Sequence, residues 1–298
     1  MRAWLNEREI TGLCLQISVD KNIDAAGAEC HVKAICLPDS ESLPRLNPSC
    51  GEQIRIEEAG KTLFFGRVER AAFDAAAGVL TLDCIDPAAT LARNQCYGPY
   101  LGTPAEITAQ ICRDCGLTPG TLWEGDGEET RVDAIFGRNA FRAICRLYQE
   151  ECVTEYRDGG VCVAPRGVRK ASLEHTRLLG WIARQSATSV VNRVQLCRNG
   201  EVEAQLTDEE SLRQHGLRQV TDAPDADAET EEEQMRAMLR GEQREARILL
   251  DGWNGIRCGE VLTPDKPEWG AAGDYLVTEV TVCCKNGRIT TELGMVSL

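Results

Sequence analysis

Cys112 and Cys115 are separated by two residues in the segment AQICRDCGLTP, residues 109–119. Dithiol redox centres use this spacing, and so does one half of a four-thiolate zinc site. A redox dithiol normally has its reactive cysteine at the amino end of a helix, where the dipole lowers the thiol pKa. A zinc site needs two more ligands, but the neighbouring residues Cys283 and Cys284 point to opposite faces of a predicted strand. Which chemistry fits therefore depends on where Cys112 and Cys115 lie in the secondary structure, at the amino end or the carboxyl end of a helix.

A short helix is predicted around this cysteine pair. Thr103-Pro104-Ala105-Glu106 has the pattern of a capping box with proline at the first helical position. Ile107, Ile111 and Cys115 follow at helical spacing until Gly116. Both thiols thus lie at the carboxyl end of the helix, where the dipole raises a thiol pKa. We expect them to pack in the core, with zinc or redox chemistry as the alternative, and we expect no cofactor and no metal.

Residues 1–88 show the two-residue period of half-buried strands. Leu13, Leu15, Ile17 and Val19 share one face of a predicted strand, and Cys30, Val32, Ala34 and Cys36 share one face of the next, with His31 and Lys33 opposite. The alternating segments EQIRIEE, KTLFFGRVER and VLTLDCID follow, joined by short links that favour antiparallel neighbours. This region is predicted to form a small antiparallel β-barrel or sandwich.

Residues 89–166 have a different pattern. A second helix is predicted in NAFRAICRLYQEEC, with an apolar stripe of Phe141, Ile144, Cys145, Tyr148 and Cys152. The segment VTEYRDGGVCVAP then predicts a hairpin that turns at Asp158-Gly159-Gly160. We expect a mixed α/β insert domain of two helices and a hairpin.

Residues 167–298 return to strands. A hairpin is expected at Asn199-Gly200, and the stretch 222–233 carries seven acids and no base, which is typical of a solvated loop. Thr230 and Glu233 are spaced to cap a helix that carries Met235, Met238 and Leu239, within 222–246. The fold class is therefore mostly β, with two strand-rich regions flanking a mixed α/β domain.

The composition of the chain disfavours several classes of function. The 298 residues include 43% hydrophobic side chains, enough for packed cores, and 47 acids against 33 bases give a net charge of -14. This charge disfavours specific nucleic-acid binding. The absence of a long apolar run and of a signal-peptide core predicts no membrane insertion and assembly in a cytoplasm. Fifteen cysteines at scattered spacing in such a chain predict reduced, mostly buried thiols.

Several short motifs along the chain resemble those of one family. The closing segments IRCGEVLTP, Gly273–Val280 and Arg288–Leu293 are similar to the last strands of phage late-control D proteins and related baseplate hubs. Upstream, Phe65–Val68 resembles a strand of the first barrel of these proteins, Asp86-Pro87 stands where that barrel ends, and Val191–Val194 resembles the strand that opens the second. XkdQ- and YqbQ-like hubs and the amino-terminal region of VgrG-type spikes belong to the same group. In these proteins a histidine usually follows the strand that Gly273–Val280 resembles. This chain has the stretch Val282-Cys283-Cys284 in place of that histidine.

This resemblance implies a structural baseplate hub of a contractile phage tail or a tail-like injection machine. It also implies two small antiparallel β-barrels, formed by residues 1–88 and 167–298, that flank the mixed α/β domain. The expected state is a homotrimer that forms a pseudo-sixfold ring, because each chain supplies these two similar barrels. The ring would join the hexameric tail tube protein to the trimeric central spike protein. Other baseplate proteins and a tape-measure protein are the further partners that the resemblance implies.

Two other classes of function remain open at this stage. A tail-associated cell-wall hydrolase would need catalytic residues, but His31, His175 and His215 lie in no recognisable catalytic or metal motif, so we expect none. A carbohydrate-binding tail module would need exposed aromatic side chains, and only 5% of residues are aromatic. Trp123, Trp253 and Trp269 lie near glycine or proline, and we expect them to anchor loops.

Overall fold

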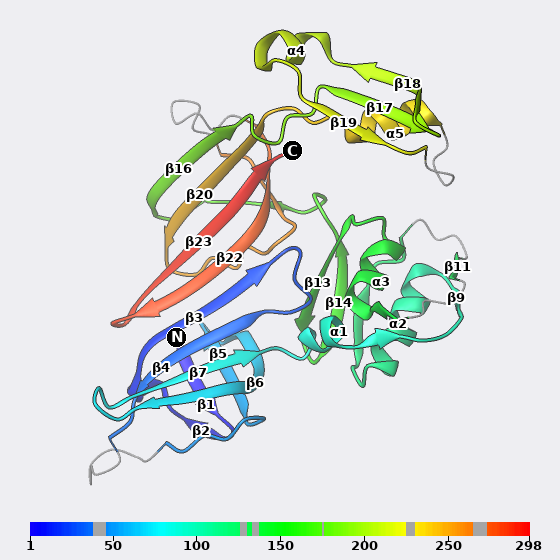
Figure 1. The fold of residues 1–298 in the computed structure, drawn as a ribbon. Helices are drawn as coiled ribbons and strands as arrows, with labels where there is room; N and C mark the ends of the chain where they lie inside the picture. The colour runs from blue at the N-terminus through cyan, green and yellow to red at the C-terminus, as the bar shows by residue number, and fades with distance from the viewer. Residues whose placement is uncertain (38–45, 126–129, 133–136, 175, 225–229, 265–272) are drawn as a thin grey trace. The chain divides into compact units, whose positions relative to one another are not determined.

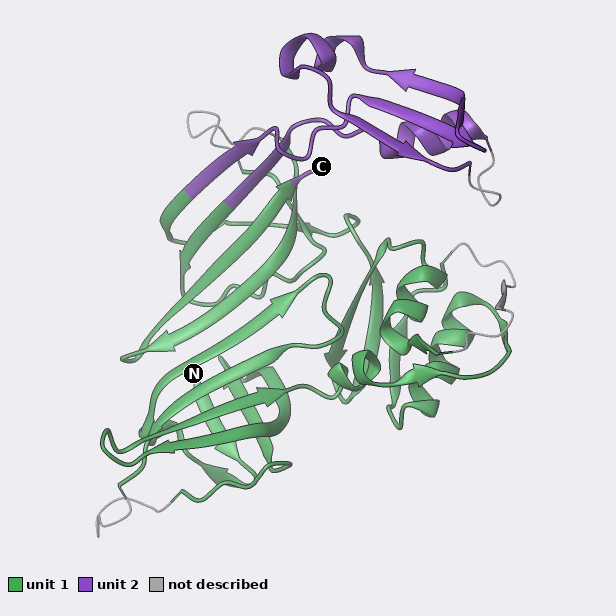
Figure 2. Cartoon of the chain, viewed as in Figure 1, with its two compact units in different colours: residues 1–181, 247–296, 298 green, residues 182–246, 297 purple. Residues whose placement is uncertain are grey.

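The computed structural model describes residues 1–37, 46–125, 130–132, 137–174, 176–224, 230–264 and 273–298 (Figure 1). The chain divides into two compact units, coloured separately in Figure 2. Unit 1 comprises residues 1–181, 247–296 and 298, and unit 2 comprises residues 182–246 and 297. Strands β16 and β20 run from one unit into the other.

A thirteen-stranded sheet dominates unit 1. Eleven of its strands follow one another in the order β16 (Leu178–Ser186), β20 (Gln243–Asp251), β23 (Arg288–Ser297), β22 (Tyr275–Lys285), β3 (Cys14–Asn22), β4 (Glu29–Ile35), β7 (Val79–Ile85), β6 (Lys61–Asp74), β5 (Gln53–Glu58), β1 (Arg2–Leu5) and β2 (Arg8–Glu9). The two short strands β15 (Lys170–Ala171) and β21 (Val261–Leu262) pair with each other beside β22, and a 3-10 turn, η1 (Thr11–Leu13), precedes β3. The prediction of a mostly β fold is confirmed.

The strands of the first and last regions of the sequence share this one sheet, because β3 pairs with β22 in antiparallel register. Strand alternation indicates which side chains share a face, but it does not identify the neighbouring strand. The described strands of residues 89–166 lie in separate small sheets, so the large sheet joins the two strand-rich regions around the insert.

The alternation predicted for β4 is confirmed, since Cys30, Val32 and Ala34 are fully buried. Leu15 of β3 differs from its prediction and is 39% exposed. The register between β3 and β4 shifts between Cys14 and Gln16, which is the signature of a β-bulge. An extra residue in one strand breaks the two-residue period and turns that side chain away from its expected face.

Within unit 1, residues 89–166, called the insert here, form three helices and several short strands: α1 (Ala89–Arg93), α2 (Pro104–Asp114), α3 (Ala140–Leu147), β8 (Gln95–Cys96), β9 (Tyr100–Gly102), β10 (Pro119–Leu122), β11 (Thr130–Val132), β12 (Arg138–Asn139), β13 (Cys152–Arg157) and β14 (Gly160–Pro165). The capping box of α2 is present in both directions: the Thr103 hydroxyl accepts from the Glu106 amide, and the Glu106 carboxylate accepts from the Thr103 amide. Asp158 and Gly159 have positive φ angles, as the predicted hairpin turn requires.

The second predicted helix is shorter than expected. It ends at Leu147, and positive φ angles at Gln149 and Glu150 then reverse the chain. Cys152 consequently begins β13 instead of continuing the helical stripe. It still packs in the same core as Phe141, Ile144, Cys145 and Tyr148, because the reversal returns it to the buried side.

Besides the ends of β16 and β20, unit 2 contains a three-stranded sheet and two helices: β17 (Arg193–Arg198), β18 (Glu201–Thr207), β19 (Gln219–Asp222), α4 (Glu209–His215) and α5 (Glu231–Met238). Val194 and Leu196 pack against Met235 of α5. Val191–Val194, which resembled the opening strand of a second barrel, leads into β17, whose partners are β18 and β19. The Asn199-Gly200 turn and the Thr230 cap are confirmed. Part of the acidic stretch 222–233 lies outside the described residues.

Candidate interaction site

The line along which β3 and β22 pair, called the seam here, joins the two strand-rich regions. Seven residue pairs define its register, including Val19 opposite Val282 and Asp20 opposite Thr281. Valines dominate its inner face because β-branched side chains fit the pleated surface of a sheet. Val19, Val280 and Val282 are each at most 3% exposed. The seam is therefore a packed junction.

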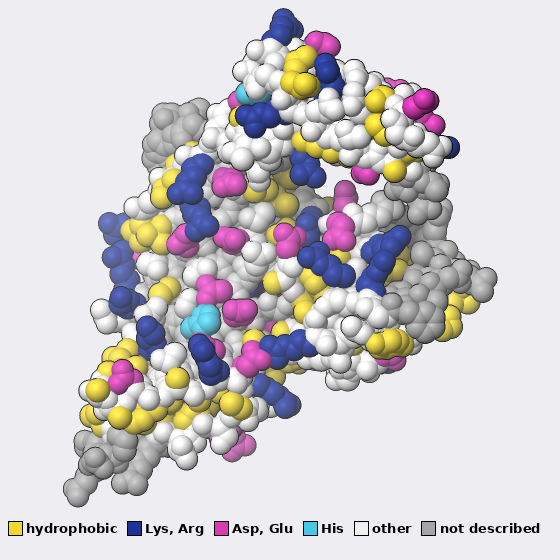
Figure 3. All heavy atoms as spheres, viewed as in Figure 1, with side chains coloured by type: hydrophobic (Ala, Val, Ile, Leu, Met, Phe, Trp, Pro, Cys, Tyr) yellow, Lys and Arg dark blue, Asp and Glu magenta, His cyan; other side chains and the backbone are white. Residues whose placement is uncertain are grey.

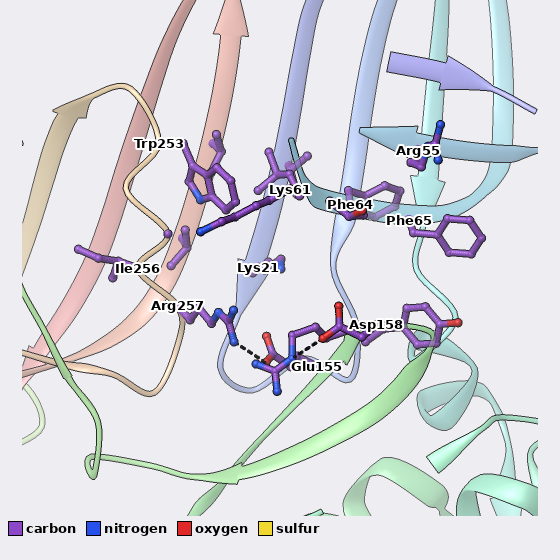
Figure 4. A pocket seen from close by; sticks show the side chains of 18 of the residues that line it. Lys21, Arg55, Lys61, Phe64, Phe65, Glu155, Asp158, Trp253, Ile256 and Arg257 are labelled. Carbon is purple, nitrogen blue, oxygen red and sulfur yellow. Dashed lines mark hydrogen bonds and ion pairs between the residues drawn. The ribbon is translucent and has the colours of Figure 1, made fainter. Parts of the chain in front are cut away.

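A pocket of about 740 Å³ lies over the inner face of the seam, and it is called the seam pocket here (Figure 4). Four segments surround it: the seam strands, the β5–β6 hairpin, the tip of the β13–β14 hairpin and the loop 253–257. Buried Phe64 and Ile256 extend the valine floor, and half-buried Trp253 adds an indole wall. All of these segments belong to unit 1.

The rim of the seam pocket is basic. Five basic side chains line the pocket against two acidic ones, in a chain whose net charge is -14. The basic residues are Lys21, Arg55, Lys61, Arg157 and Arg257, and the acids are Glu155 and Asp158. The pocket lining therefore has an excess of basic side chains, although the chain as a whole has an excess of acidic ones.

Glu155 is shared between two of these arginines. Its carboxylate lies 3.1 Å from a guanidinium nitrogen of Arg157 and 3.4 Å from one of Arg257. Arg157 also approaches Asp158 at 3.5 Å, and Arg55 approaches Glu57 at 3.3 Å. These pairs already engage the three arginines, and the Arg257–Glu155 pair joins the loop 253–257 to β13.

The two lysines of the rim differ from the three arginines in having no close carboxylate partner. Within the described ranges, neither the Lys21 nor the Lys61 ammonium lies within 4.0 Å of a carboxylate oxygen. Lys21 projects from β3 beside the valine floor, and Figure 4 shows Lys61 extending from the start of β6 toward Trp253. The seam pocket thus combines an apolar floor with two available ammonium groups.

The outer face of the same sheet has paired charges. The Thr281 hydroxyl donates to Asp20 at 2.6 Å, and the Ser18 hydroxyl donates to the other oxygen of Asp20 at 3.0 Å. His31 and Arg70 contact the two oxygens of Asp83 at 2.9 and 2.6 Å. Hydrogen bonds from His31 and then Arg70 hold the pKa of Asp83 below its ordinary value.

This polar row crosses five neighbouring strands, from β22 to β6. In Figure 3, basic and acidic side chains are interspersed on the face shown. The same pairing continues toward the other end of the sheet, where Arg247 contacts Glu279 at 3.4 Å and Glu292 at 3.1 Å. The outer face is thus a surface of compensated charge.

Asp86 closes the first strand-rich region at the position expected from the sequence. Its two carboxylate oxygens accept from the backbone amides of Ala28 at 2.8 Å and Ala89 at 3.3 Å. A side chain at Gly27 would place its Cβ 2.2 Å from Asp86 Oδ1, so the approach requires glycine. Burial raises the pKa of the Asp86 carboxyl to about 6.

The cysteine pair lies in the core of the insert. Cys112 is fully buried, and Cys115 packs against the same cluster. Burial raises the pKa of the Cys112 thiol to about 12 and that of Cys115 to about 11, which opposes thiolate chemistry. All fifteen cysteines are free thiols in the structure, and eight of them are buried. Over the described ranges, no group of three or more His, Cys, Asp or Glu side chains is placed to hold a metal ion.

The other residues singled out in the sequence are dispersed. His215 lies 3.4 Å from Glu242 in unit 2, far along the chain from the His31 row, while His175 and Trp269 lie outside the described residues. Trp123 stacks on Tyr148 with ring centroids 5.3 Å apart, as expected for an anchoring side chain. Of these histidines and tryptophans, as far as the structure describes them, only Trp253 lines the seam pocket. None of the helices in the described part of the chain combines the length and apolar character needed to cross a membrane.

The fold is that of phage tail proteins. The 43 kDa tail protein of prophage MuSo2 from Shewanella oneidensis superposes with a TM-score of 0.77 at 14% identity, covering 99% of this chain and 96% of that chain. A tail protein from Neisseria meningitidis MC58 gives 0.71 at 11% identity, covering 99% and 95%. The E. coli c3393 protein, a type VI secretion component with similarity to the T4 tail proteins gp27 and gp5, gives 0.57 at 10% identity, covering 100% and 75%. No family model and no curated protein sequence matches the chain.

Proposed function

We propose that this chain is the hub subunit of a contractile phage tail or of a tail-derived injection machine. The observation that carries the proposal is the extent of the structural match, which covers 99% of this chain and 96% of the Shewanella tail protein. Both strand-rich regions and the insert lie within that match. The similarity to the E. coli secretion component extends the same fold to injection machines.

In this proposal three copies form a ring that joins the tail tube to the central spike, with further contacts to other baseplate proteins. Residues 1–88 and 167–298 would each supply a barrel to the ring, and residues 89–166 would lie outside it. The large sheet ends in two edge strands, β16 and β2. Open edges favour pairing with another chain, and a closed ring of subunits covers them. Assembly would take place in the bacterial cytoplasm.

The test is the mass of the protein in solution together with a negative-stain image. A trimeric ring with threefold symmetry supports the hub, whereas a monomer with cell-wall lytic activity would establish the hydrolase class instead. A trimer carries a net charge of -42, three times that of one chain. Moderate salt screens repulsion beyond about 10 Å at 0.1 M, so trimer formation should increase from low to moderate salt.

A further inference from the structure

The seam pocket has features of a binding site that a structural junction does not require. Its floor of Val19, Val280 and Val282 is apolar, and Trp253 stands beside it. Its volume of about 740 Å³ falls within the range of about 300–1,000 Å³ that is typical of ligand pockets. An apolar floor with a small number of polar groups at fixed positions is the usual design of such sites.

The charges indicate what the pocket accepts. Arg157 and Arg257 are already engaged by Glu155, whereas Lys21 and Lys61 have no carboxylate within 4.0 Å among the described residues. Two ammonium groups beside an apolar surface complement a carboxylate that stands next to an apolar side chain. A long polyanion such as nucleic acid is disfavoured, because the net charge of -14 repels it while a single carboxylate experiences mainly the local lysines.

We propose that the seam pocket binds an extended peptide segment of a partner protein, in which an acidic residue is flanked by leucine or an aromatic residue. The carboxylate lies between Lys21 and Lys61, and the apolar side chain contacts the valine floor and Trp253. This inference goes beyond the hub role and does not depend on the ring, because a single chain forms the whole pocket. The seam then connects the two strand-rich regions and also marks a docking position.

An array of synthetic heptapeptides tests the proposal on the full chain. The central residue is Glu, Gln or Lys, and its neighbours are Leu, Phe or Ser. We expect Glu peptides with Leu or Phe neighbours to bind above their Gln and Lys counterparts. The best peptide is then measured by fluorescence polarisation with the double variant Lys21→Ala/Lys61→Ala, for which we expect about tenfold weaker binding, equivalent to about 1.4 kcal/mol.

Lys33→Ala/Lys285→Ala is the matched control, since it removes the same charge from exposed lysines that do not line the pocket. It should leave binding unchanged. Trp253→Ala should weaken binding of the Leu and Phe peptides severalfold, whereas Val202→Ala, an exposed apolar side chain in unit 2, should not.

The proposal would be overturned by no binding across the array, by equal binding of Glu and Gln peptides, or by equal losses in the two lysine double variants. Binding of a single-stranded DNA oligonucleotide that depends on Lys21 and Lys61 would also reject the peptide. None of these measurements depends on oligomeric state, so the hub proposal stands or falls separately.

Discussion

The Thr281 hydroxyl donates a 2.6 Å hydrogen bond to a carboxylate oxygen of Asp20, and the two residues are 261 positions apart in the sequence. They face each other across the seam in the register that pairs Val282 with Val19. The bond therefore reports directly on the junction between the two strand-rich regions. It can be broken without disturbing the buried valines on the other face of the sheet.

Thr281→Val should lower the free energy of unfolding by about 1.5 kcal/mol, because a hydrogen bond to a charged group is lost while the shape of the side chain is kept. A double-mutant cycle with Asp20→Asn, measured by urea denaturation, should give a coupling energy of about 1 kcal/mol. Thr62→Val changes an exposed strand threonine and serves as the control. A cycle that is additive within error would show that the bond does not stabilise the seam.

Gly66→Ala should destabilise the protein by about 3 kcal/mol or prevent its folding. A Cβ at this position would lie 2.2 Å from the carbonyl oxygen of Ile85 and 2.6 Å from the Phe64 ring, so the β5–β6 and β6–β7 pairings must shift. Gly12→Ala is the matched control, because no heavy atom lies within 4 Å of its added Cβ. The melting temperatures of both variants are measured by thermal unfolding, and we expect a lower value for Gly66→Ala. Equal melting temperatures would contradict the steric argument.

Asp86 should make stability fall as pH rises from about 4 to about 6. Burial raises its pKa from 3.8 to about 6, so the folded state binds the proton more tightly than the unfolded state between these values. Stability from this group is then fully present below the unfolded pKa and is lost as pH rises through the folded pKa. The difference in unfolding free energy between wild type and Asp86→Asn should decrease by about 3 kcal/mol across this range.

Urea denaturation of both proteins at several pH values measures this difference. Carboxyl carbon NMR of Asp86 supplies a second readout, with a titration midpoint near 6 as the expected result. A difference that stays constant, or that grows with pH, would show that the two backbone amides outweigh the effect of burial.

Cys50 should be the first thiol to react with iodoacetamide in the native protein, since it is the one exposed cysteine of the fifteen. Cys112 should react at least about 100-fold more slowly, because it is fully buried and its pKa is raised to about 12. Peptide mass spectrometry after timed labelling follows each site. Cys50→Ser should remove the fast phase, and labelling of Cys112 at the rate of Cys50 would contradict its place in the core.

Local pattern predicted much of the fold. The alternation of Cys30, Val32 and Ala34 indicated a strand with one buried face, and the capping box at Thr103 fixed the start of α2. Both patterns depend only on residues that are close together in the sequence. The structures that they predict therefore form whichever strands pair later. Leu15 and Cys152 departed from their predictions because a bulge and a chain reversal changed the local period.

The seam and its pocket could not be predicted in this way. Val282 alternates as clearly as Val19, but alternation gives the face of a strand and not its partner. The pocket combines Lys21, Lys61 and Trp253 from three distant segments, each unremarkable alone. The site follows from long-range pairing, which single-sequence patterns do not encode.

The pairing of β3 with β22 also has a consequence for biosynthesis. Strand β3 ends at Asn22 and β22 begins at Tyr275. A ribosome adds roughly 5–20 residues per second, so about 250 residues separate the two strands by roughly 10–50 s of translation. Throughout that interval the edge of β3 can pair with any available strand, including one from a neighbouring nascent chain. We expect the yield of correctly folded protein to depend on chaperone access and translation speed between these two strands more than on the stability of the finished fold.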